Sequence, residues 1–490
     1  MTATTHPLDE SAVGALAAAL RGRLIRPDDG DYDAARAVYN GMIDVRPALI
    51  VQCVDAADVV AGVTFARTTG IDVAIRGGGH NGPGLGTSTG LVLDLAPMNG
   101  VRVDPTAATA TVEGGAELGA LDHAAHPWGL ATPAGIISST GVGGLTLGGG
   151  IGHLSRRYGL SLDNLLAVDV VLADGTLVRA DADHEPDLFW AVRGGGGNFG
   201  VVTSFTFALH PVSTVLAGPM FFPLDRAAEV LRLYRTFLPT APEELNGFFA
   251  FLTVPPLDPF PAELHLQKVC GVIWCYTGDP AAFDELIAPM RALQPVLDGV
   301  APMPYPALQS AFDGLYTPKV DHWYWRADFV REIPEEAVAL HVEHGATMPT
   351  PQSTMHLYPI DGAVRRVPAD ATAFAYRDCT WAMVIVGVDP DPGKDDVLRR
   401  WCVDYYEALH PYSAGGAYVN FLMDEGADRV AATYWQNYDR LRRVKAAYDP
   451  DNLFHVNQNI PPATGEGSAG TLPQPRAATE ERASAEAKTR

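Results

Sequence analysis

Three glycine-rich segments in the first half of the chain constrain its fold more than any other feature. They read GGGHNG from Gly77, TGVGGLTLGGGIG from Thr140 and RGGGGNFG from Arg193. Because glycine has no Cβ, a ligand can lie directly against its backbone N–H groups. Each segment adjoins a run typical of a strand, so we expect three loops that hold one ligand along the main chain. The alternative is three ordinary tight turns.

Two of these segments satisfy the pattern G-x-G-x-x-G, at Gly77–Gly82 and Gly195–Gly200. In a Rossmann βαβ unit a helix follows the glycines directly, because its N-terminus holds the pyrophosphate of the dinucleotide. Here Pro83 and further glycines follow the first segment, and the strand-like run VVTSFTF follows the second. The sequence therefore predicts against a Rossmann site.

A first region, residues 46–211, alternates short apolar runs with glycine-rich turns. Its run DAADVVAGVTFARTTG predicts a helix, because Asp55 can cap the start and Gly70 can end it. A strand-like run on either side of this helix predicts a βαβ unit. Further along, VVLADGTLVRA predicts a hairpin with Asp174–Gly175 as its turn. We expect strands at Ile50–Val51, Val73–Ile75, Leu91–Leu95, Thr109–Val112 and Val168–Leu172.

A second region, residues 212–412, predicts a separate α+β domain with an antiparallel sheet. Its expected strands alternate apolar with polar residues, and helical runs follow them. The expected strands are Gly247–Val254 and Leu266–Tyr276, and the expected helices are Pro280–Leu293, Glu335–His344 and Asp395–Leu409.

The remaining parts of the chain flank these two regions. Residues 1–45 predict an N-terminal helical segment. Residues 415–460 carry AYVNFLMDEG and then the helical run YDRLRRVKAAYD, which Pro450 stops. Residues 461–490 hold no aromatic residue and one leucine, so we expect a disordered tail.

Charge balance and cysteine usage exclude several classes of function. The net charge is −23, from 35 basic and 58 acidic residues without a basic cluster, which argues against a nucleic-acid partner. No run of about 18 apolar residues occurs, so we expect no membrane span. The five cysteines are scattered without metal-ligand spacing. We therefore expect no metal site, free thiols and a reducing compartment, the cytoplasm.

His80 stands inside the first glycine segment. A histidine between glycines is expected to be exposed, with a ring that is free to react. The alternative is a turn histidine that bonds its own backbone.

Four motifs carry a resemblance to a known family. They are RGGGHN after a strand, GVGGLTLGGGIGHLSRRYGLSLDNL, DLFWAVRGGGGNFGVVTSFTF and the closing YDPDNLFHVNQNI, in this order between Arg46 and Ile460. With them, and with DGAVRRVPADATAFAYR in the second region, the chain resembles the berberine-bridge-enzyme-like FAD-linked oxidases. These belong to the vanillyl-alcohol-oxidase (p-cresol methylhydroxylase-type) flavoprotein superfamily, and the resemblance is to its bacterial type with a single histidyl link.

The resemblance implies a fold class, a cofactor and its contacts. The fold class is α+β. The FAD-binding domain is of the p-cresol methylhydroxylase type and has two parts, residues 46–211 and 415–460. Between them in the sequence lies a substrate domain, residues 212–412, with an antiparallel sheet backed by helices. In such proteins the histidine of the first glycine loop is bonded to the flavin 8α-methyl carbon, which here is His80. The implied FAD contacts are Arg76, Gly77, Gly78, Gly79, His80, Asn81, Pro133, Ala134, Gly135, Ser139, Thr140, Gly141, Gly144, Gly148, Gly149, Gly152, Asn164, Gly200, Val201, Asn457 and Asn459.

One departure from the family concerns a second covalent link. Many members carry a cysteine in the sequence AGIC, where this chain reads AGII with Ile137 in the cysteine's place. The resemblance therefore implies a flavin held by the histidyl bond alone.

Tyr418 in AYVNF is the candidate base for substrate oxidation. On a strand, Tyr418 and Asn420 would point the same way, and in the family a tyrosine of this segment approaches the flavin. His80 cannot serve, because alkylation occupies one ring nitrogen. A phenol with a pKa near 10 is a poor base unless its anion is stabilised, for example by a guanidinium. The alternative is a tyrosine that makes an ordinary hydrogen bond in a sheet.

Other side chains are candidates for the substrate pocket. In MHLYPIDGAVRRV, His356 and Tyr358 share one face, and a similar stretch supplies active-site side chains in relatives, so Tyr358 is a second candidate catalytic residue. Trp323 and Trp325 share a face of DHWYWRADF and are either pocket wall or core. His153 either lies near the flavin or caps the following helix.

The resemblance implies an FAD-dependent oxidoreductase. Such an enzyme takes a hydride from a small organic substrate, an alcohol, an amine or a polyketide-like compound, and oxygen reoxidises the flavin to give hydrogen peroxide. The alternatives are a flavin-dependent oxygenase of secondary metabolism, a flavin dehydrogenase that avoids oxygen, and a non-catalytic flavoprotein. The expected partners are the small substrate and oxygen. The substrate, sugars included, and the oligomeric state stay open.

Overall fold

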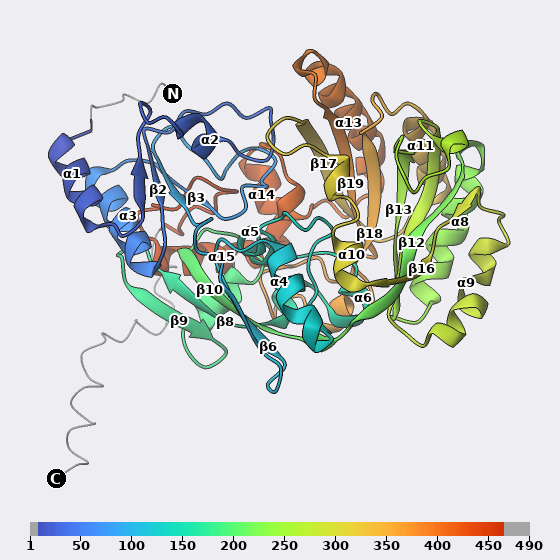
Figure 1. Cartoon of the computed structure of the whole chain (residues 1–490), viewed down its shortest axis with the longest axis horizontal. Helices are drawn as coiled ribbons and strands as arrows, with labels where there is room; N and C mark the ends of the chain where they lie inside the picture. The colour runs from blue at the N-terminus through green and yellow to red at the C-terminus, as the bar shows by residue number, and fades with distance from the viewer. Residues whose placement is uncertain (1–7, 465–490) are drawn as a thin grey trace, which may run out of the picture.

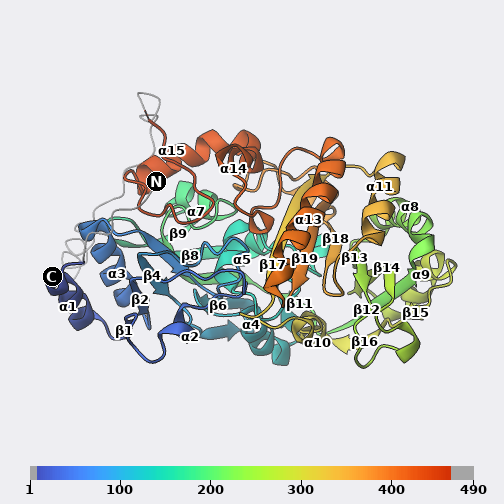
Figure 2. The same ribbon diagram turned by 90° about the horizontal axis from the view of Figure 1, so that it is seen from above.

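The computed structural model describes residues 8–464 and places them in two halves that lie side by side (Figure 1). The first half holds a four-stranded, a five-stranded and a small two-stranded sheet, and the second half holds a larger sheet. After the large sheet the chain returns to the first half, where α15 (Tyr438–Tyr448) packs against α7 (Pro186–Val192) (Figure 2).

The first sheet contains the predicted βαβ unit, which is confirmed. The strands β2 and β3 both run parallel to β4, which lies between them, and α3 connects β2 to β3. Asp55 caps the start of α3, and Gly70 ends it with a φ of 71°, in the left-handed region that favours glycine. The bounds are β1 (Arg23–Ile25), β2 (Leu49–Gln52), α3 (Ala56–Thr69), β3 (Val73–Arg76) and β4 (Leu91–Asp94).

The sequence had predicted a helical N-terminal segment, but the structure shows a strand in it as well as helices. After α1 (Glu10–Ala19) it forms β1, which pairs antiparallel with β2, and then α2 (Tyr32–Arg36). Ile25 of β1 is fully buried beside Ile50 of β2. This short strand therefore adds to the edge of the sheet, because pairing with β2 buries the Ile25 side chain, which a surface helix would leave exposed.

The second sheet is antiparallel and has five strands in the order β5-β6-β10-β8-β9. The predicted hairpin is confirmed: β8 pairs with β9 across Asp174–Gly175. The bounds are β5 (Val101–Asp104), β6 (Thr109–Glu113), β8 (Leu165–Val171), β9 (Leu177–Asp181) and β10 (Val201–Ala208).

The large sheet has eight strands, all paired antiparallel, in the order β15-β12-β14-β13-β18-β19-β17 with β16 beside β12. The helices α8 (Ala227–Phe237), α9 (Phe283–Arg291), α11 (Glu335–Ala346) and α13 (Asp395–Leu409) back one face (Figure 2). The predicted α+β class, with an antiparallel sheet backed by helices, is confirmed. The strand bounds are β12 (Thr214–Pro223), β13 (Leu245–Thr253), β14 (Lys268–Tyr276), β15 (Leu297–Asp298), β16 (Ala301–Pro304), β17 (His322–Val330), β18 (Thr354–Pro359) and β19 (Trp381–Asp389).

The central strands of this sheet are buried on both faces, whereas the sequence had predicted one apolar and one polar face. In β14 every residue after Lys268 is buried, and β19 is buried throughout. The reason is that helices cover one face while the other face turns toward the first half of the molecule.

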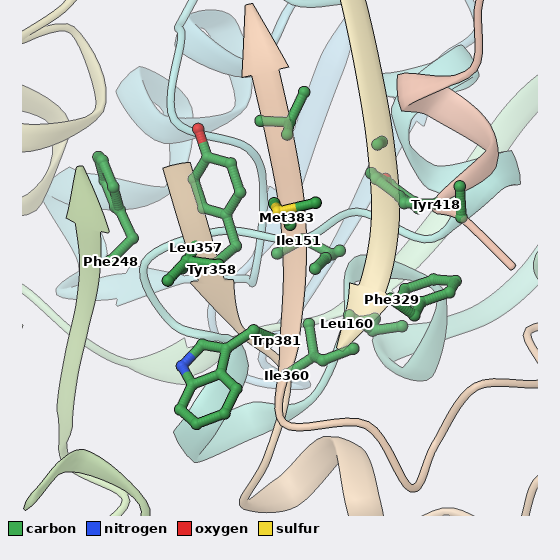
Figure 3. Packing of buried hydrophobic residues seen from close by; sticks show 14 of the residues in the cluster. Ile151, Leu160, Phe248, Phe329, Leu357, Tyr358, Ile360, Trp381, Met383 and Tyr418 are labelled. Carbon is green, nitrogen blue, oxygen red and sulfur yellow. The ribbon is translucent and has the colours of Figure 1, made fainter. Parts of the chain in front are cut away.

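One hydrophobic core extends through both halves. Its largest cluster contains Ile151 and Leu160 from the first half together with Leu357 and Trp381 from the large sheet (Figure 3). Because this core is continuous, the two halves are held in one arrangement, and the space between them has a defined shape.

The remaining elements connect these layers. Among residues 8–464, no helix has both the length and the apolar character needed to span a bilayer. The same part of the chain brings no three histidine, cysteine or acidic side chains together as metal ligands, and its five cysteines are all buried and free. The predicted disordered tail falls largely on residues 465–490, outside the described residues. The other helices and short strands are α4 (Leu118–Ala125), β7 (Leu130–Ala131), α5 (Val142–Gly148), α6 (Ser155–Tyr158), β11 (His210–Pro211), α10 (Tyr305–Gln309), α12 (Ala363–Arg366) and α14 (Ala427–Tyr434).

Candidate active site

A cavity of about 990 Å³ lies between the glycine segments and the large sheet. All three glycine segments line it, with Gly78, Gly144 and Gly197 among the lining residues. The opposite wall is the uncovered face of β13, β17, β18 and β19. Three segments that are far apart in the sequence therefore border one space, whose size suits a cofactor with its substrate.

His80 borders this cavity just after β3. Its ring stacks on the ring of Tyr39 at a centroid distance of 3.6 Å, and its Nε2 has no hydrogen-bond partner among the described residues. Burial lowers the pKa of His80 to about 4, so the imidazole is neutral and keeps a lone pair. The expectation of an exposed ring was wrong, because Tyr39 covers one face of it.

The N-terminal segment supplies two site residues that the sequence analysis missed. Tyr39 stacks on His80, and Asn40 connects the first glycine segment to the large sheet. The Asn40 amide donates to the carbonyl oxygens of Gly82 at 2.8 Å and Trp323 at 3.0 Å, and its Oδ1 accepts the Trp323 N–H at 3.0 Å. No motif marks these two residues, because their partners come from distant parts of the chain.

The second glycine segment contains the helix α5, where the sequence had predicted a loop beside a strand. The helix forms because Val142 and Leu147 are buried in the core. At its start Gly141 touches Gly78 of the first segment: a Cβ built on Gly78 would lie 2.4 Å from the Gly141 nitrogen. The two segments therefore meet backbone to backbone, a contact that only glycine permits.

The cavity wall fits a flavin nucleotide. Gly144 and Gly197 line the cavity, and a Cβ built on either would have no neighbour within 4 Å, so both present bare backbone to open space. The Oδ1 of Asn457 is buried without a partner in the described part of the chain, as is the Nε2 of His80. Exposed backbone and unpaired polar atoms at one wall suit a ligand with a pyrophosphate and a polar ring.

The structure divides the predicted cofactor contacts into two groups. Those that line the cavity are Arg76, Gly77, Gly78, Gly79, His80, Asn81, Gly135, Thr140, Gly141, Gly144, Gly200 and Asn457. Those that lie behind its wall are Pro133, Ala134, Ser139, Gly148, Gly149, Gly152, Asn164, Val201 and Asn459. Gly143, Gly196, Gly197 and Asn198 of the glycine segments also line the cavity, and so does Gln458, which the sequence analysis did not name.

Several residues behind the wall have packing roles. A Cβ on Gly148 would lie 2.2 Å from the Asn420 Oδ1, and one on Gly152 would lie 1.7 Å from the Ala134 oxygen. The side chain of Asn164 donates to the carbonyl of Leu160 at 2.8 Å. Val201 is fully buried in the second core cluster. These residues shape the wall because close backbone approach or a local hydrogen bond requires them.

Ile137 of the AGII sequence lines the cavity. The adjacent residue is tied to the second half of the molecule. Asp313 accepts the Ser138 backbone N–H at 2.9 Å, and its other oxygen accepts the Ser138 hydroxyl. A carboxylate from the second half of the molecule therefore holds this loop of the first half.

Tyr418 lies on the cavity wall, but not on a strand as the sequence had predicted. It precedes a single 3-10 turn, Val419–Phe421. The turn still brings the two predicted side chains together: the phenol oxygen of Tyr418 accepts the Asn420 amide at 2.8 Å and the Gly150 backbone N–H at 2.7 Å. Gly149 permits this approach, since a Cβ there would lie 2.8 Å from the Tyr418 ring.

The surroundings of Tyr418 act on its pKa in two directions. Burial raises the pKa of Tyr418 to about 12, and the hydrogen bonds from Gly150 and Asn420 lower it, because both stabilise the phenolate. No arginine within residues 8–464 donates to this oxygen. The guanidinium that the sequence suggested is thus replaced by a backbone N–H and an amide.

Tyr358 also lines the cavity, and it forms a hydrogen-bonded chain with His356 and Thr354 on β18. The distance between the Tyr358 hydroxyl and the His356 Nδ1 is 2.6 Å, and that between the His356 Nε2 and the Thr354 Oγ1 is 2.9 Å. Thr354 in turn donates to the Phe251 carbonyl at 2.7 Å. Burial raises the pKa of Tyr358 well above its usual value and lowers the pKa of His356 to about 3, so both are neutral.

The two tryptophans of β17 lie on the cavity side of the large sheet. Trp323 and Trp325 both line the cavity, and their indole N–H groups have no partner in the part of the chain that the structure describes. His153 does not cap the following helix, because Leu154 is at the N-cap position. Its side chain is buried, and its ring centroid lies 6.1 Å from that of Phe248.

Comparison with known proteins places this geometry among flavoproteins. Residues 47–181 match the family model "FAD binding domain", and residues 417–461 match "Berberine and berberine like". Those two ranges carry His80 and Tyr418.

Individual relatives extend the match over most of the chain. The chain is 32% identical to the FAD-linked oxidoreductase YgaK of Bacillus subtilis, over 90% of this chain and 97% of that protein. It is 30% identical to (R)-6-hydroxynicotine oxidase of Paenarthrobacter nicotinovorans, over 92% and 98%. The crystal structure of 6-hydroxy-D-nicotine oxidase from Arthrobacter nicotinovorans superposes with a TM-score of 0.81 and 26% identity, over 91% and 98%.

Proposed function

Because the chain belongs to the berberine-bridge-enzyme-like FAD-linked oxidoreductases, we propose that it binds its FAD covalently through His80 and oxidises a small organic substrate with oxygen as the electron acceptor. When bound, the flavin supplies the acceptor for a hydride from a substrate carbon and, once reduced, passes two electrons to oxygen to give hydrogen peroxide.

The observation that supports the covalent link is the state of His80. Its ring is neutral, its Nε2 has no partner among residues 8–464, and Tyr39 holds the ring at the cavity wall. A neutral imidazole keeps a lone pair on one of its two ring nitrogens, and that nitrogen can be alkylated. Since Ile137 offers no thiol, the flavin has one covalent attachment.

The protein must also accept one proton, because oxidation of an alcohol releases a proton from its hydroxyl. We assign this role to Tyr418. Its oxygen receives two donors, which stabilise the phenolate against the burial that raises its pKa to about 12, and its own proton has no acceptor within the described residues. Tyr358 has the opposite pattern, since its proton is engaged by His356, so it is better suited to bind substrate than to accept a proton.

Peptide mass tests the attachment. The purified protein is denatured and digested, and the peptide that contains His80 is weighed. We expect the mass of the peptide plus the flavin nucleotide in the wild type, and no modified peptide in His80→Ala. An unmodified His80 peptide from a visibly yellow protein would contradict the covalent link.

Peroxide stoichiometry tests the oxidase assignment. We expect one hydrogen peroxide per substrate molecule oxidised. Substrate consumption without peroxide would instead indicate an oxygenase. Slow reoxidation of the anaerobically reduced protein in air would indicate a dehydrogenase.

A further inference from the structure

We propose that the substrate is an uncharged, flat aromatic compound that carries a hydroxyl or N–H group, and that Tyr358 binds this group as a hydrogen-bond acceptor. The inference rests on the proposed function, because it concerns the same cavity. It depends on three observations: the aromatic wall, the pairing of its polar side chains, and the direction of the hydrogen bonds along β18.

The substrate side of the cavity is an aromatic wall. Rings from neighbouring strands of the large sheet and from the turn after Tyr418 line it, and Figure 3 shows Phe248 and Tyr358 on two of these strands. Phe248 lies 5.0 Å from both Tyr358 and His356, and Tyr358 lies 5.8 Å from Phe421, all between ring centroids. Faces of this kind favour a planar apolar ligand.

Charged side chains are nearly absent from the cavity. Among the described residues that line it, only Arg76 and Asp258 are charged. Arg76 is on the glycine-segment side, where it pairs with Asp94 at 2.9 Å, and Asp258 is in the loop after β13. A charged substrate would lose its hydration without gaining a partner at the aromatic wall, which is unfavourable.

Several polar side chains of the wall are paired with the protein, whereas the indole N–H groups of Trp323 and Trp325 and the hydroxyl of Thr253 have no partner among the described residues. The Gln352 amide donates to Asp321 at 3.0 Å, and Ser353 and Thr350 bond each other at 2.6 Å. Thr354 and His356 are both engaged in the β18 chain. A sugar has a hydroxyl on most of its carbons and needs many partners, so this wall suits it poorly.

The hydrogen bonds along β18 have one direction. Thr354 has a single proton, which it donates to the Phe251 carbonyl, so its oxygen accepts from His356. The proton of the neutral imidazole is therefore on Nε2, and Nδ1 carries the lone pair. Tyr358 consequently donates its own proton to Nδ1.

This direction decides what Tyr358 can bind. Because its proton is committed to His356, the phenol oxygen can only accept a hydrogen bond from a ligand in the cavity. An O–H or N–H group on the substrate therefore fits, because it can donate to the phenol oxygen. An ether or a carboxylate at the same place can only accept, and Tyr358 has no free proton to donate to it.

Tyr418 and Tyr358 flank one ring. Phe421 lies 4.8 Å from Tyr418 and 5.8 Å from Tyr358, between ring centroids. A flat substrate over Phe421 can place its oxidised alcohol at Tyr418 and its second polar group at Tyr358. In this reaction the carbon–oxygen single bond becomes a carbonyl, the hydride from the carbon would go to the flavin of the proposed function, and the hydroxyl proton would pass to the Tyr418 phenolate.

Calorimetric titration of the holoprotein with three matched probes tests the inference. The probes are naphthylmethanols that carry a hydroxyl, a methoxy or a carboxylate group at the position farthest from the hydroxymethyl arm, and cellobiose is the fourth ligand. We expect the hydroxyl probe to bind about tenfold more tightly than the methoxy probe, from one hydrogen bond. The carboxylate probe and cellobiose should bind more weakly still.

Two variants isolate the role of Tyr358. In Tyr358→Phe the preference for hydroxyl over methoxy should fall below about twofold, since the acceptor is gone. In His356→Phe the Tyr358 proton is released, so that Tyr358 can also donate to the methoxy oxygen and the preference should fall as well. Tyr276→Phe alters a tyrosine of the same sheet that lies outside the cavity, and it should keep the wild-type preference. Thermal unfolding confirms that each variant is folded.

The outcomes separate this inference from the proposed function. A full preference retained in Tyr358→Phe would overturn the inference, and so would equal binding of the carboxylate probe or tighter binding of cellobiose. If the His80 peptide from the same batch carries flavin, the proposed function survives that result. If the peptide is unmodified but the preference depends on Tyr358, the substrate class holds and the covalent link is wrong.

Discussion

The phenol oxygen of Tyr418 accepts the backbone N–H of Gly150 at 2.7 Å, at the end of a glycine run that lies 268 positions away in the sequence. The same oxygen accepts the Asn420 amide, whereas Tyr358 across Phe421 donates its proton to His356. The two tyrosines of one cavity therefore have opposite hydrogen-bond environments. The donors to Tyr418 partly offset the burial that raises its pKa to about 12, whereas no donor stabilises the anion of Tyr358, whose pKa burial raises well above its usual value.

The first prediction concerns the pH dependence of catalysis. Because Tyr418 must be deprotonated to accept a proton, kcat/KM should rise with pH, about tenfold per pH unit, up to the pKa of Tyr418. Asn420→Leu removes a donor that lowers this pKa, so the rising limb should move to higher pH by about one unit. The measurement is kcat/KM from pH 6 to pH 10, about the accessible range.

Tyr418→Phe serves as the control for this profile. It should lower kcat/KM at least about a hundredfold, leave the His80 peptide modified, and remove the rising limb. Wild-type activity in Tyr418→Phe would exclude the tyrosine from the mechanism.

A second prediction tests the bare backbone at Gly144. This residue is in α5, yet it faces open cavity, so Gly144→Leu should fill flavin space while favouring the helix. Most of the bound flavin should be lost, as the ratio of flavin to protein absorbance measures. Gly14 in α1 has equally open surroundings away from the cavity. Gly14→Leu should therefore keep its flavin and gain about 0.8 kcal/mol of stability. Full flavin content in Gly144→Leu would place the cofactor elsewhere.

A third prediction concerns the clamp between Asp313 and Ser138. Asp313→Ala removes both acceptors, so the loop at residues 132–141 should open more often, and its amide hydrogens should exchange faster by about tenfold or more. Mass spectrometry of the exchanged peptides measures this. Asp284→Ala alters an exposed aspartate of a surface ion pair and should leave that loop unchanged. Equal protection in both variants would show that the clamp does not hold the loop.

A fourth prediction concerns Lys445, which ties the returning C-terminal segment to the third glycine segment. It is fully buried and donates to Asp449 at 2.6 Å, Asn198 at 2.7 Å and Phe454 at 2.9 Å. Lys445→Met leaves the Asp449 carboxylate buried and unpaired. The free energy of unfolding should therefore fall by about 3–5 kcal/mol, measured by urea denaturation. Arg21→Met breaks an exposed ion pair and should cost less than about 1 kcal/mol. Similar small losses in both would mean that the buried pair contributes little.

Local sequence patterns predicted most of the helices, strands and turns named here, but only some features of the candidate site. The helix after Asp55, the hairpin at Asp174–Gly175 and the helix Asp395–Leu409 all follow from caps, turns and periodicity within a short window, and all are confirmed. The strand expected at Tyr418 was wrong, because a four-residue stretch cannot distinguish a strand from a 3-10 turn. The glycine-rich segments predicted a ligand site because they contain so many glycines. The number of glycines could not show, however, that Gly144 and Gly148 have different surroundings. The first faces the cavity and the second faces Asn420.

The sequence by itself determined the family, the α+β class and the residue types available for chemistry, because these depend on local order along the chain. Only the tertiary structure decided which residues meet. It placed Tyr39 against His80, Gly150 against Tyr418 and Asp313 against Ser138, and it covered one face of a histidine that its glycine neighbours had suggested was exposed. The physical reason is that burial and hydrogen-bond partners arise from segments packed together in space, so the pKa of a side chain and the free face of a glycine depend on residues far away in sequence.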